Sequence, residues 1–220
     1  MKAKKSASTP PKARTFLAHS SQTCLFLERW PLMNFHEAET CIWSAVGIFW
    51  LLAAFVQKRT IRRQSIGTRL LQVGIVLLPL IPFIIFNRSL KILDTTFLPG
   101  AWAMHSLGLL LTLFGCALAV WARIVLGSNW SGTVTVKENH VLITHGPYAW
   151  VRHPIYSGFL LALVGTVLVL GKFLWLLTVG LALLATWLKS RAEEEFMYQE
   201  FGEQYSAYQQ RVKALIPGLL

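Results

Sequence analysis

Charged residues are scarce in this chain of 220 amino acids. They make up 14% of the sequence, whereas a soluble domain contains roughly 25%. Hydrophobic residues reach 54%, and the mean hydropathy is +0.50. This composition excludes a disordered chain, a fibrous repeat and most soluble enzymes. It predicts one integral membrane domain, because this length is enough for a single domain.

Several catalytic and cofactor-binding motifs are missing. The sequence has no G-x-S-x-G elbow and no P-loop, and no two of its 15 glycines stand two positions apart, which excludes a Rossmann phosphate turn. Asp94 is the only aspartate, so a Ser-His-Asp hydrolase is not expected. Neither a disulfide framework nor a metal site is predicted from the spacing of the histidines and of the three cysteines, Cys24, Cys41 and Cys116.

Apolar runs predict the fold class. A membrane-spanning helix needs about 20 residues, with a range of about 17–25. Each of five runs fits one such helix, and they cover about 41–56, 70–86, 101–126, 154–170 and 173–188. From Lys189 to Leu215 apolar residues recur at spacings of three and four, which predicts an amphipathic helix, with Gly202 as a possible kink or interruption. The prediction is an all-α integral membrane protein with about five transmembrane helices and a C-terminal cytosolic amphipathic helix.

Basic residues outnumber acidic ones, 21 to 10, and the formal net charge is +11. They are spread over short connectors between the apolar runs, which favours lipid headgroups and control of topology over nucleic acid. If the C-terminus lies in the cytosol, the predicted cytosolic segments hold twelve Lys and Arg residues and the outside connectors hold three. The N-terminal tail holds the remaining six. Either this tail lies outside, or translation begins at Met33.

The chain divides into three parts within one membrane domain. Residues 1–32 are basic and are expected to be disordered. Residues 33–126 carry the first three transmembrane helices. Residues 127–220 contain a polar connector, a helical hairpin and the C-terminal helix. The polar residues of the connector and of that last helix flank the hairpin on the same side, so they can meet in space.

Helix geometry sorts the acidic residues after the fifth run. Glu193 and Glu194 precede Met197 by four and three residues, which places both near the apolar, inward face. Glu195 points away, and Lys189 shares the face of Glu193 one turn earlier. One interpretation is an ordinary solvated acidic run. The other is a functional site, because unpaired charge at a membrane interface is costly.

Two more candidates open the fourth run. Arg152 stands at a helix start, where the helix dipole disfavours a cation. It is either a side chain that reaches the membrane interface or a functional group. His153 is likewise either an interfacial residue without a role or part of a site.

The motifs in the C-terminal half resemble those of a known family. GPYAWVRHPIYSG at 146–158 is followed by the hairpin, then by a glutamate pair and FG-x-x-Y-x-x-Y within 193–208, and by Ile-Pro at 216–217. With NWSG at 129–132, this order resembles the isoprenylcysteine carboxyl methyltransferases and their bacterial relatives. Phospholipid methyltransferases and sterol-type membrane reductases share the RHP-x-Y-x-G and FG elements. The resemblance is therefore more specific for the superfamily than for the substrate.

The resemblance implies a membrane enzyme that uses S-adenosylmethionine, held between the connector and the C-terminal helix. Lys189 stands where the family has a basic residue, often Arg, near the substrate carboxylate. A lysine offers a point charge where arginine offers a fork. The implied catalytic residues are Lys189, Arg152 and His153. The implied cofactor-binding residues are His140, Val141, Leu142 and Ile143 in a strand-like stretch, then Tyr148, His153, Pro154, Ile155, Tyr156, Glu193 and Glu194.

The predicted reaction is carboxyl O-methylation of an isoprenylcysteine-like or other lipophilic acid that enters from the bilayer. A carboxylate is already ionised near neutral pH, so the enzyme needs no base and must mainly align donor and acceptor. The sulfonium of the cofactor could face the rings of Tyr148, Trp150 or Tyr156. Three alternatives stay open: an N-methyltransferase acting on a phospholipid or amine, with His153 as base; a sterol-type reductase using NADPH; and a non-catalytic membrane scaffold.

Overall fold

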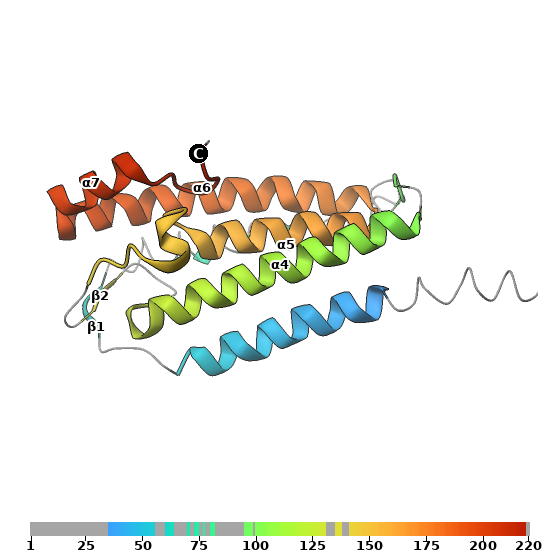
Figure 1. The fold of residues 1–220 in the computed structure, drawn as a ribbon, viewed down its shortest axis with the longest axis horizontal. Helices are drawn as coiled ribbons and strands as arrows, with labels where there is room; N and C mark the ends of the chain where they lie inside the picture. The colour runs from blue at the N-terminus through green and yellow to red at the C-terminus, as the bar shows by residue number, and fades with distance from the viewer. Residues whose placement is uncertain are drawn as a thin grey trace, which may run out of the picture.

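Helices dominate the computed structural model and lie side by side in one elongated bundle (Figure 1). The structure describes residues 35–55, 60–63, 70, 73–74, 77, 80–81, 95–98, 100–130, 135–137 and 141–218. The predicted tail 1–32 and most of the predicted run 70–86 lie outside the described residues. The helical fold class is confirmed in its coarse form. The exception is a short ribbon of two strands.

The described helices correspond to four of the five predicted apolar runs. The first occupies 35–53 and so begins before the predicted run 41–56. The third run and the turn that follows it form a helix of 28 residues, and the second helix of the hairpin has 29 residues. Both are long and apolar enough to cross a membrane. The helix between them has 17 residues. The named helices are α4 (Trp102–Leu126), α5 (Pro154–Leu170), α6 (Phe173–Phe201) and α7 (Glu203–Arg211), with 3₁₀ turns η3 (Gly127–Asn129) and η4 (Gly146–Ala149).

The helical hairpin predicted at Gly171-Lys172 is present. α5 ends at Gly171, whose N–H donates to the carbonyl of Val167 at 2.7 Å, and α6 begins at Phe173. The turn also pairs with a distant segment, because the N–H of Phe97 donates to the Gly171 carbonyl at 2.8 Å and Thr96 forms a bridge with Lys172. These contacts fix the chain just before α4 at this end of the bundle.

Glycines allow α4 and α5 to pack with their backbones in contact. A Cβ atom on Gly115 would lie 2.5 Å from both the nitrogen of Ala162 and the carbonyl oxygen of Gly158, closer than real Cβ contacts. Gly108 and Gly165 face each other in the same way, since a Cβ atom on either one would lie 2.7 or 2.5 Å from the carbonyl oxygen of the other. Small residues at helix–helix contacts are typical of membrane bundles, where close van der Waals packing drives association.

Helix 35–53 runs in the same direction as α4. The ring of Phe35 stacks on that of His105 near the start of α4, with 5.6 Å between centroids. At the other end the carbonyl of Ala53 accepts a hydrogen bond from Arg123, in the last turn of α4. Between these helices the chain therefore returns from one end of the bundle to the other. The predicted second span would make that crossing.

A buried carboxylate fixes helix 35–53 against the hairpin. Glu39 is only 5% exposed, and its Oε1 accepts hydrogen bonds from the hydroxyls of Thr112 on α4 and Thr166 on α5, and from the indole N–H of Trp43. Hydrogen bonds between helices stabilise packing where water is absent. This contact sets the position of helix 35–53, whose far end reaches Arg123.

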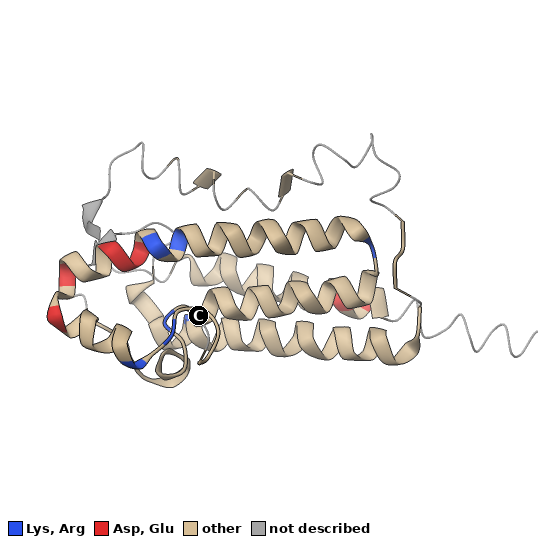
Figure 2. Ribbon diagram, turned by 90° about the horizontal axis from the view of Figure 1, so that it is seen from above, with Lys and Arg blue, Asp and Glu red and all other residues tan. Residues whose placement is uncertain are grey.

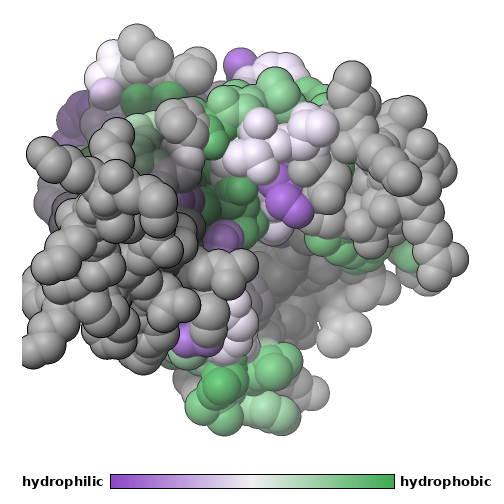
Figure 3. Space-filling model, turned by 90° about the vertical axis from the view of Figure 1, so that its right-hand side faces the viewer, coloured by the Kyte–Doolittle hydropathy of each residue, from purple (hydrophilic) through white to green (hydrophobic). Residues whose placement is uncertain are grey.

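The two ends of the bundle differ in character. At one end, β1 (Thr60–Arg63) pairs antiparallel with β2 (Thr135–Lys137), so the segment after helix 35–53 joins the connector after α4. Charged positions on the last part of α6 and on α7 gather at this same end (Figure 2). The opposite end, which contains the Gly171-Lys172 turn, shows mixed hydrophobic and polar surface (Figure 3).

The C-terminal segment departs from one continuous helix. Gly202 separates α6 from α7 with φ of +52°, a left-handed conformation that favours glycine because it lacks a Cβ. The chain reverses here, and α7 runs back over the connector (Figure 1). The Tyr208 hydroxyl accordingly donates to the Tyr148 carbonyl at 2.6 Å. The suggested interruption at Gly202 is present, and the helix that follows ends at Arg211, short of the predicted end at Leu215.

Candidate active site

The start of α5 is held by the segment that follows α7. The backbone N–H groups of Arg152 and His153 donate to the carbonyls of Lys213 and Ala214 at 2.8 and 3.0 Å. One turn later, the hydroxyl of Ser157 donates to a carbonyl in the same segment at 2.5 Å. This pairing fixes the backbone of the Arg-His-Pro motif and presents its side chains to α6.

His153 lies between the two glutamates of α6. Its Nδ1 is 3.5 Å from Glu193 Oε2, and its Nε2 is 3.2 Å from Glu194 Oε1. Burial alone would lower the pKa of His153, but hydrogen bonds and charges from the two carboxylates outweigh it and raise the pKa above its ordinary value. Both ring nitrogens of His153 therefore face a carboxylate oxygen, an arrangement that suits an imidazole with two N–H donors.

Arg152 forms an ion pair with Glu194 and hydrogen bonds with the C-terminal segment. Its Nη2 and Nε lie 2.6 and 3.0 Å from Glu194 Oε1, and both side chains are 11% exposed. Its Nη1 donates to the carbonyls of Gln209 and Val212. Burial would raise the pKa of Glu194, but His153 and Arg152 hold it below the ordinary value. Glu194 in turn neutralises the arginine that the helix dipole would disfavour.

Glu193 is the more open carboxylate of the pair. Its side chain is 23% exposed, and the hydroxyl of Tyr156 donates to its Oε1 at 2.6 Å. Lys189 lies one turn earlier, with Nζ 5.6 Å from the centroid of the Tyr156 ring. Burial would raise the pKa of Glu193, but His153, Lys189 and Tyr156 together hold it below the ordinary value. The predicted inward placement of Glu193 and Glu194, with Lys189 on the same face, is therefore present.

Tyr148 forms the other wall of this region from η4. It is 7% exposed, and its hydroxyl donates to the carbonyl of Ala122 at 3.4 Å. Burial raises the pKa of Tyr148, Glu193 raises it further, and Arg123 acts in the opposite direction. The pKa of Tyr148 is thus influenced by the charges of both a carboxylate on α6 and a guanidinium on α4. Pro154 and Ile155 occupy the first turn of α5, where they are buried and half-buried.

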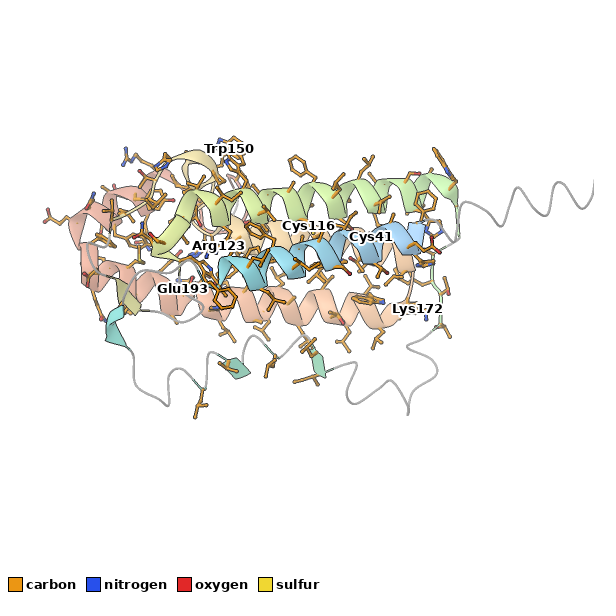
Figure 4. All side chains as sticks on the ribbon, turned by 90° about the horizontal axis from the view of Figure 1, so that it is seen from below. Cys41, Cys116, Arg123, Trp150, Lys172 and Glu193 are labelled. Atoms are coloured by element: carbon orange, nitrogen blue, oxygen red, sulfur yellow. The ribbon has the colours of Figure 1, made fainter. Side chains whose placement is uncertain are left out.

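Other predicted residues are not brought into this cluster. Val141 is 58% exposed, and residues 141–143 form no strand, because the strand of the connector is β2 at Thr135–Lys137. His140 lies outside the described residues. Trp150 is 57% exposed and packs edge-on against Trp121 on the outside of α4 (Figure 4). The suggestion that its ring faces the sulfonium is not supported by this position.

Two residues of this region were missed in the sequence. Gln209 donates to Glu194 Oε2 at 3.3 Å from α7, a contact that exists only because the chain reverses at Gly202. Arg123 is buried in the last turn of α4. Arg123 could have been identified from its position inside an apolar run, because a charged residue within a membrane segment is a candidate functional residue.

Comparisons with known proteins identify the family. The model of the isoprenylcysteine carboxyl methyltransferase family matches residues 102–199. Protein-S-isoprenylcysteine O-methyltransferase of Tribolium castaneum is 37% identical over 134 residues, which cover 57% of this chain and 47% of that protein. Protein-S-isoprenylcysteine O-methyltransferase B of Arabidopsis thaliana is 32% identical over 132 residues, which cover 57% of this chain and 67% of the relative.

A solved structure of the eukaryotic intramembrane Ras methyltransferase, itself an isoprenylcysteine carboxyl methyltransferase, is 26% identical with a TM-score of 0.46. That similarity covers 71% of this chain and 55% of the solved one. The chain spans about half the length of the Tribolium relative. The matched segment contains α4, the Arg-His-Pro motif and both glutamates of α6. The chain therefore belongs to the isoprenylcysteine carboxyl methyltransferase family.

Proposed function

We propose that the protein is a membrane methyltransferase that uses S-adenosylmethionine to methylate the carboxylate of a lipophilic acid, such as an isoprenylcysteine. One observation carries this proposal. His153 and Tyr156 from α5 and Glu193 and Lys189 from α6 converge at the charged end of an apolar bundle. A polar site at the edge of such a bundle suits a soluble cofactor and a membrane-bound acceptor.

The residues of the cluster fit the groups of this cofactor. When bound, S-adenosylmethionine supplies an electrophilic methyl group on a positively charged sulfur. The partly exposed Glu193 retains lone pairs that can accept hydrogen bonds from hydroxyl or ammonium groups. His153 and Arg152 orient the two glutamates, so the carboxylates are positioned before any ligand arrives.

The electrostatics favour a carboxylate acceptor over an amine. An amine acceptor must lose a proton, and His153 is the only base that the sequence suggested. Both ring nitrogens of this histidine face carboxylates, Glu193 and Glu194, so neither is turned toward an incoming amine. A carboxylate needs no base, and we propose that Lys189 offsets its negative charge beside Glu193.

The reaction class is tested with purified protein in detergent and S-adenosylmethionine labelled in its methyl group. Incubation with a prenylcysteine analogue should transfer the label to the acceptor. Because a methyl ester is base-labile, alkali should release the label as volatile methanol. Label that survives alkali would indicate an amine or thiol acceptor. Absence of transfer together with binding of NADPH would support the reductase instead.

We also propose that the charged end of the bundle faces the cytosol. The predicted cytosolic segments hold twelve basic residues against three outside, and the 60–63 strand, the connector and α7 lie at one end. Reporter fusions placed after Arg63 and after Leu220 should both report the cytosol. A fusion at Lys172, in the opposite turn, should report the other compartment. Opposite results for Arg63 and Leu220 would contradict this topology.

A further inference from the structure

Arg123 is a buried cation that the proposed reaction has not yet used. It lies in the last turn of α4 and is 3% exposed. Among the described residues no carboxylate lies within ion-pair distance of it, whereas Arg152 pairs with Glu194. A buried charge without a counter-charge is strongly unfavourable, so a charged group of this kind usually serves an anionic partner.

The guanidinium is held in place by neutral groups and keeps donors to spare. Nη1 donates to the carbonyl of Gly127 at 2.7 Å, and Nη2 donates to that of Ala53 at 2.6 Å. The guanidinium also stacks over the ring of Trp130 at 4.5 Å. Nε is buried and has no hydrogen-bond partner. Since a guanidinium has five N–H donors, it retains the capacity to bind a carboxylate through two of them.

The surroundings of Arg123 suit an acid that carries an apolar tail. The ring of Trp130 meets that of Trp50, with 6.4 Å between centroids, and Trp50 meets Phe159 at 5.0 Å. Phe159 stacks in turn on Trp43 at 6.2 Å. These rings form a row from Arg123 into the bundle, between helix 35–53 and α5. Aromatic rings provide a large apolar contact area for a hydrocarbon chain.

The position of Arg123 also matches that of an acceptor relative to the proposed cofactor site. Tyr148, one of the predicted cofactor-binding residues, borders Arg123, since its hydroxyl donates to the carbonyl of Ala122, the preceding residue. Arg123 and Glu193 lie at the same end of the bundle (Figure 4). Lys189 already faces the negative charge of Glu193, whereas Arg123 has no such neighbour in the described part of the chain.

We propose that Arg123 binds the carboxylate of the methyl acceptor, with the apolar tail along the row of Trp130, Trp50, Phe159 and Trp43. This inference rests on the proposed carboxyl methylation and names the group that recognises its substrate. Arg123 would hold the acceptor through one carboxylate oxygen or both. Lys189 would then offset the remaining negative charge of the acceptor carboxylate beside Glu193.

The test compares an acid with a neutral molecule of the same shape. Binding of N-acetyl-S-farnesylcysteine and of its carboxamide is measured without turnover, in the presence of S-adenosylhomocysteine, and palmitate serves as a second acid. Wild-type protein should prefer the farnesylcysteine acid to its amide. Arg123→Lys keeps the positive charge but loses the fork, so we expect at least a tenfold loss of affinity for both acids. Affinity for the amide and for S-adenosylhomocysteine should stay within threefold.

The matched control is Arg191→Lys, because Arg191 also stacks on a tryptophan, Trp187, but is exposed. It should leave all four affinities unchanged. An equal loss for acid and amide in Arg123→Lys would mean that Arg123 only supports the fold, and would overturn the proposal. So would a wild-type protein that binds neither acid or does not distinguish the farnesylcysteine acid from its amide. Failure of the methyltransferase proposal can be distinguished from failure of this one, because the wild-type protein would then not bind S-adenosylhomocysteine at all.

Discussion

Replacing Glu193 with glutamine should weaken the binding of S-adenosylhomocysteine at least tenfold. The amide oxygen of glutamine can still accept the hydrogen bond from Tyr156, so the local packing is kept. What is lost is the negative charge that faces His153 and Lys189 and the acceptor capacity of the second oxygen. Hydrogen bonds to a charged group contribute about 1.5–3 kcal/mol, which corresponds to roughly 10- to 100-fold in affinity. Calorimetry on the detergent-purified protein measures the change.

The control for this substitution is Glu195→Gln. Glu195 is two positions further along α6, is exposed and accepts a hydrogen bond only from Gln199, at 3.0 Å, among the described side chains. Its loss should leave the affinity unchanged. Both variants should elute as a single species with the retention volume of the wild type. Unchanged affinity in Glu193→Gln would remove Glu193 from the proposed cofactor site.

Lys189→Ala is expected to lower kcat/KM for an acidic acceptor by about 10- to 100-fold, again from the loss of one charge-assisted contact. The affinity for S-adenosylhomocysteine should fall much less, because Glu193 keeps its contacts with Tyr156 and His153. Lys189→Arg should retain activity, since it preserves the positive charge over the Tyr156 ring. Initial rates with labelled cofactor give kcat and KM, and calorimetry gives the affinity.

Arg191→Ala serves as the reference for Lys189→Ala. It removes a basic residue from the same helix, but one whose guanidinium lies over Trp187 at 5.4 Å on the exposed surface. Its kinetics should match those of the wild type. If Lys189→Ala and Arg191→Ala lower turnover equally, the effect reflects the general surface charge. If the product resists alkali, the acceptor is not a carboxylate and Lys189 has another role.

Periodicity and length were sufficient to predict the hairpin and the inward glutamates. A run of 17 apolar residues, a Gly-Lys turn and a second run require two antiparallel helices. The 100° rotation per residue then places Glu193 and Glu194 beside His153 once the hairpin has formed. The hairpin and the inward direction of the two glutamates follow from local geometry, because each depends on residues close together in the sequence.

The remaining features depend on long-range contacts that a pattern does not contain. Arg123 is recognisable as unusual, but its partner Ala53 lies 70 residues earlier in the chain. The reversal at Gly202 follows from one backbone conformation, and glycine is equally compatible with a kink. The expected strand-like stretch is absent at 141–143, the part of it that the structure describes, for a related reason. Strand pairing there is set by β1, and the paired residues are Thr135–Lys137.

The pairing of residues 213–215 with the start of α5 has a consequence for biosynthesis. Every helix of the bundle precedes these residues in the chain, and the Arg152 side chain also reaches the carbonyl of Val212. During synthesis on the ribosome, the hairpin is therefore made before the segment that completes its polar end. A nascent chain that stopped after α6 would expose the N–H groups of Arg152 and His153. The polar end of the hairpin is thus completed only once residues 212–215 have joined the chain.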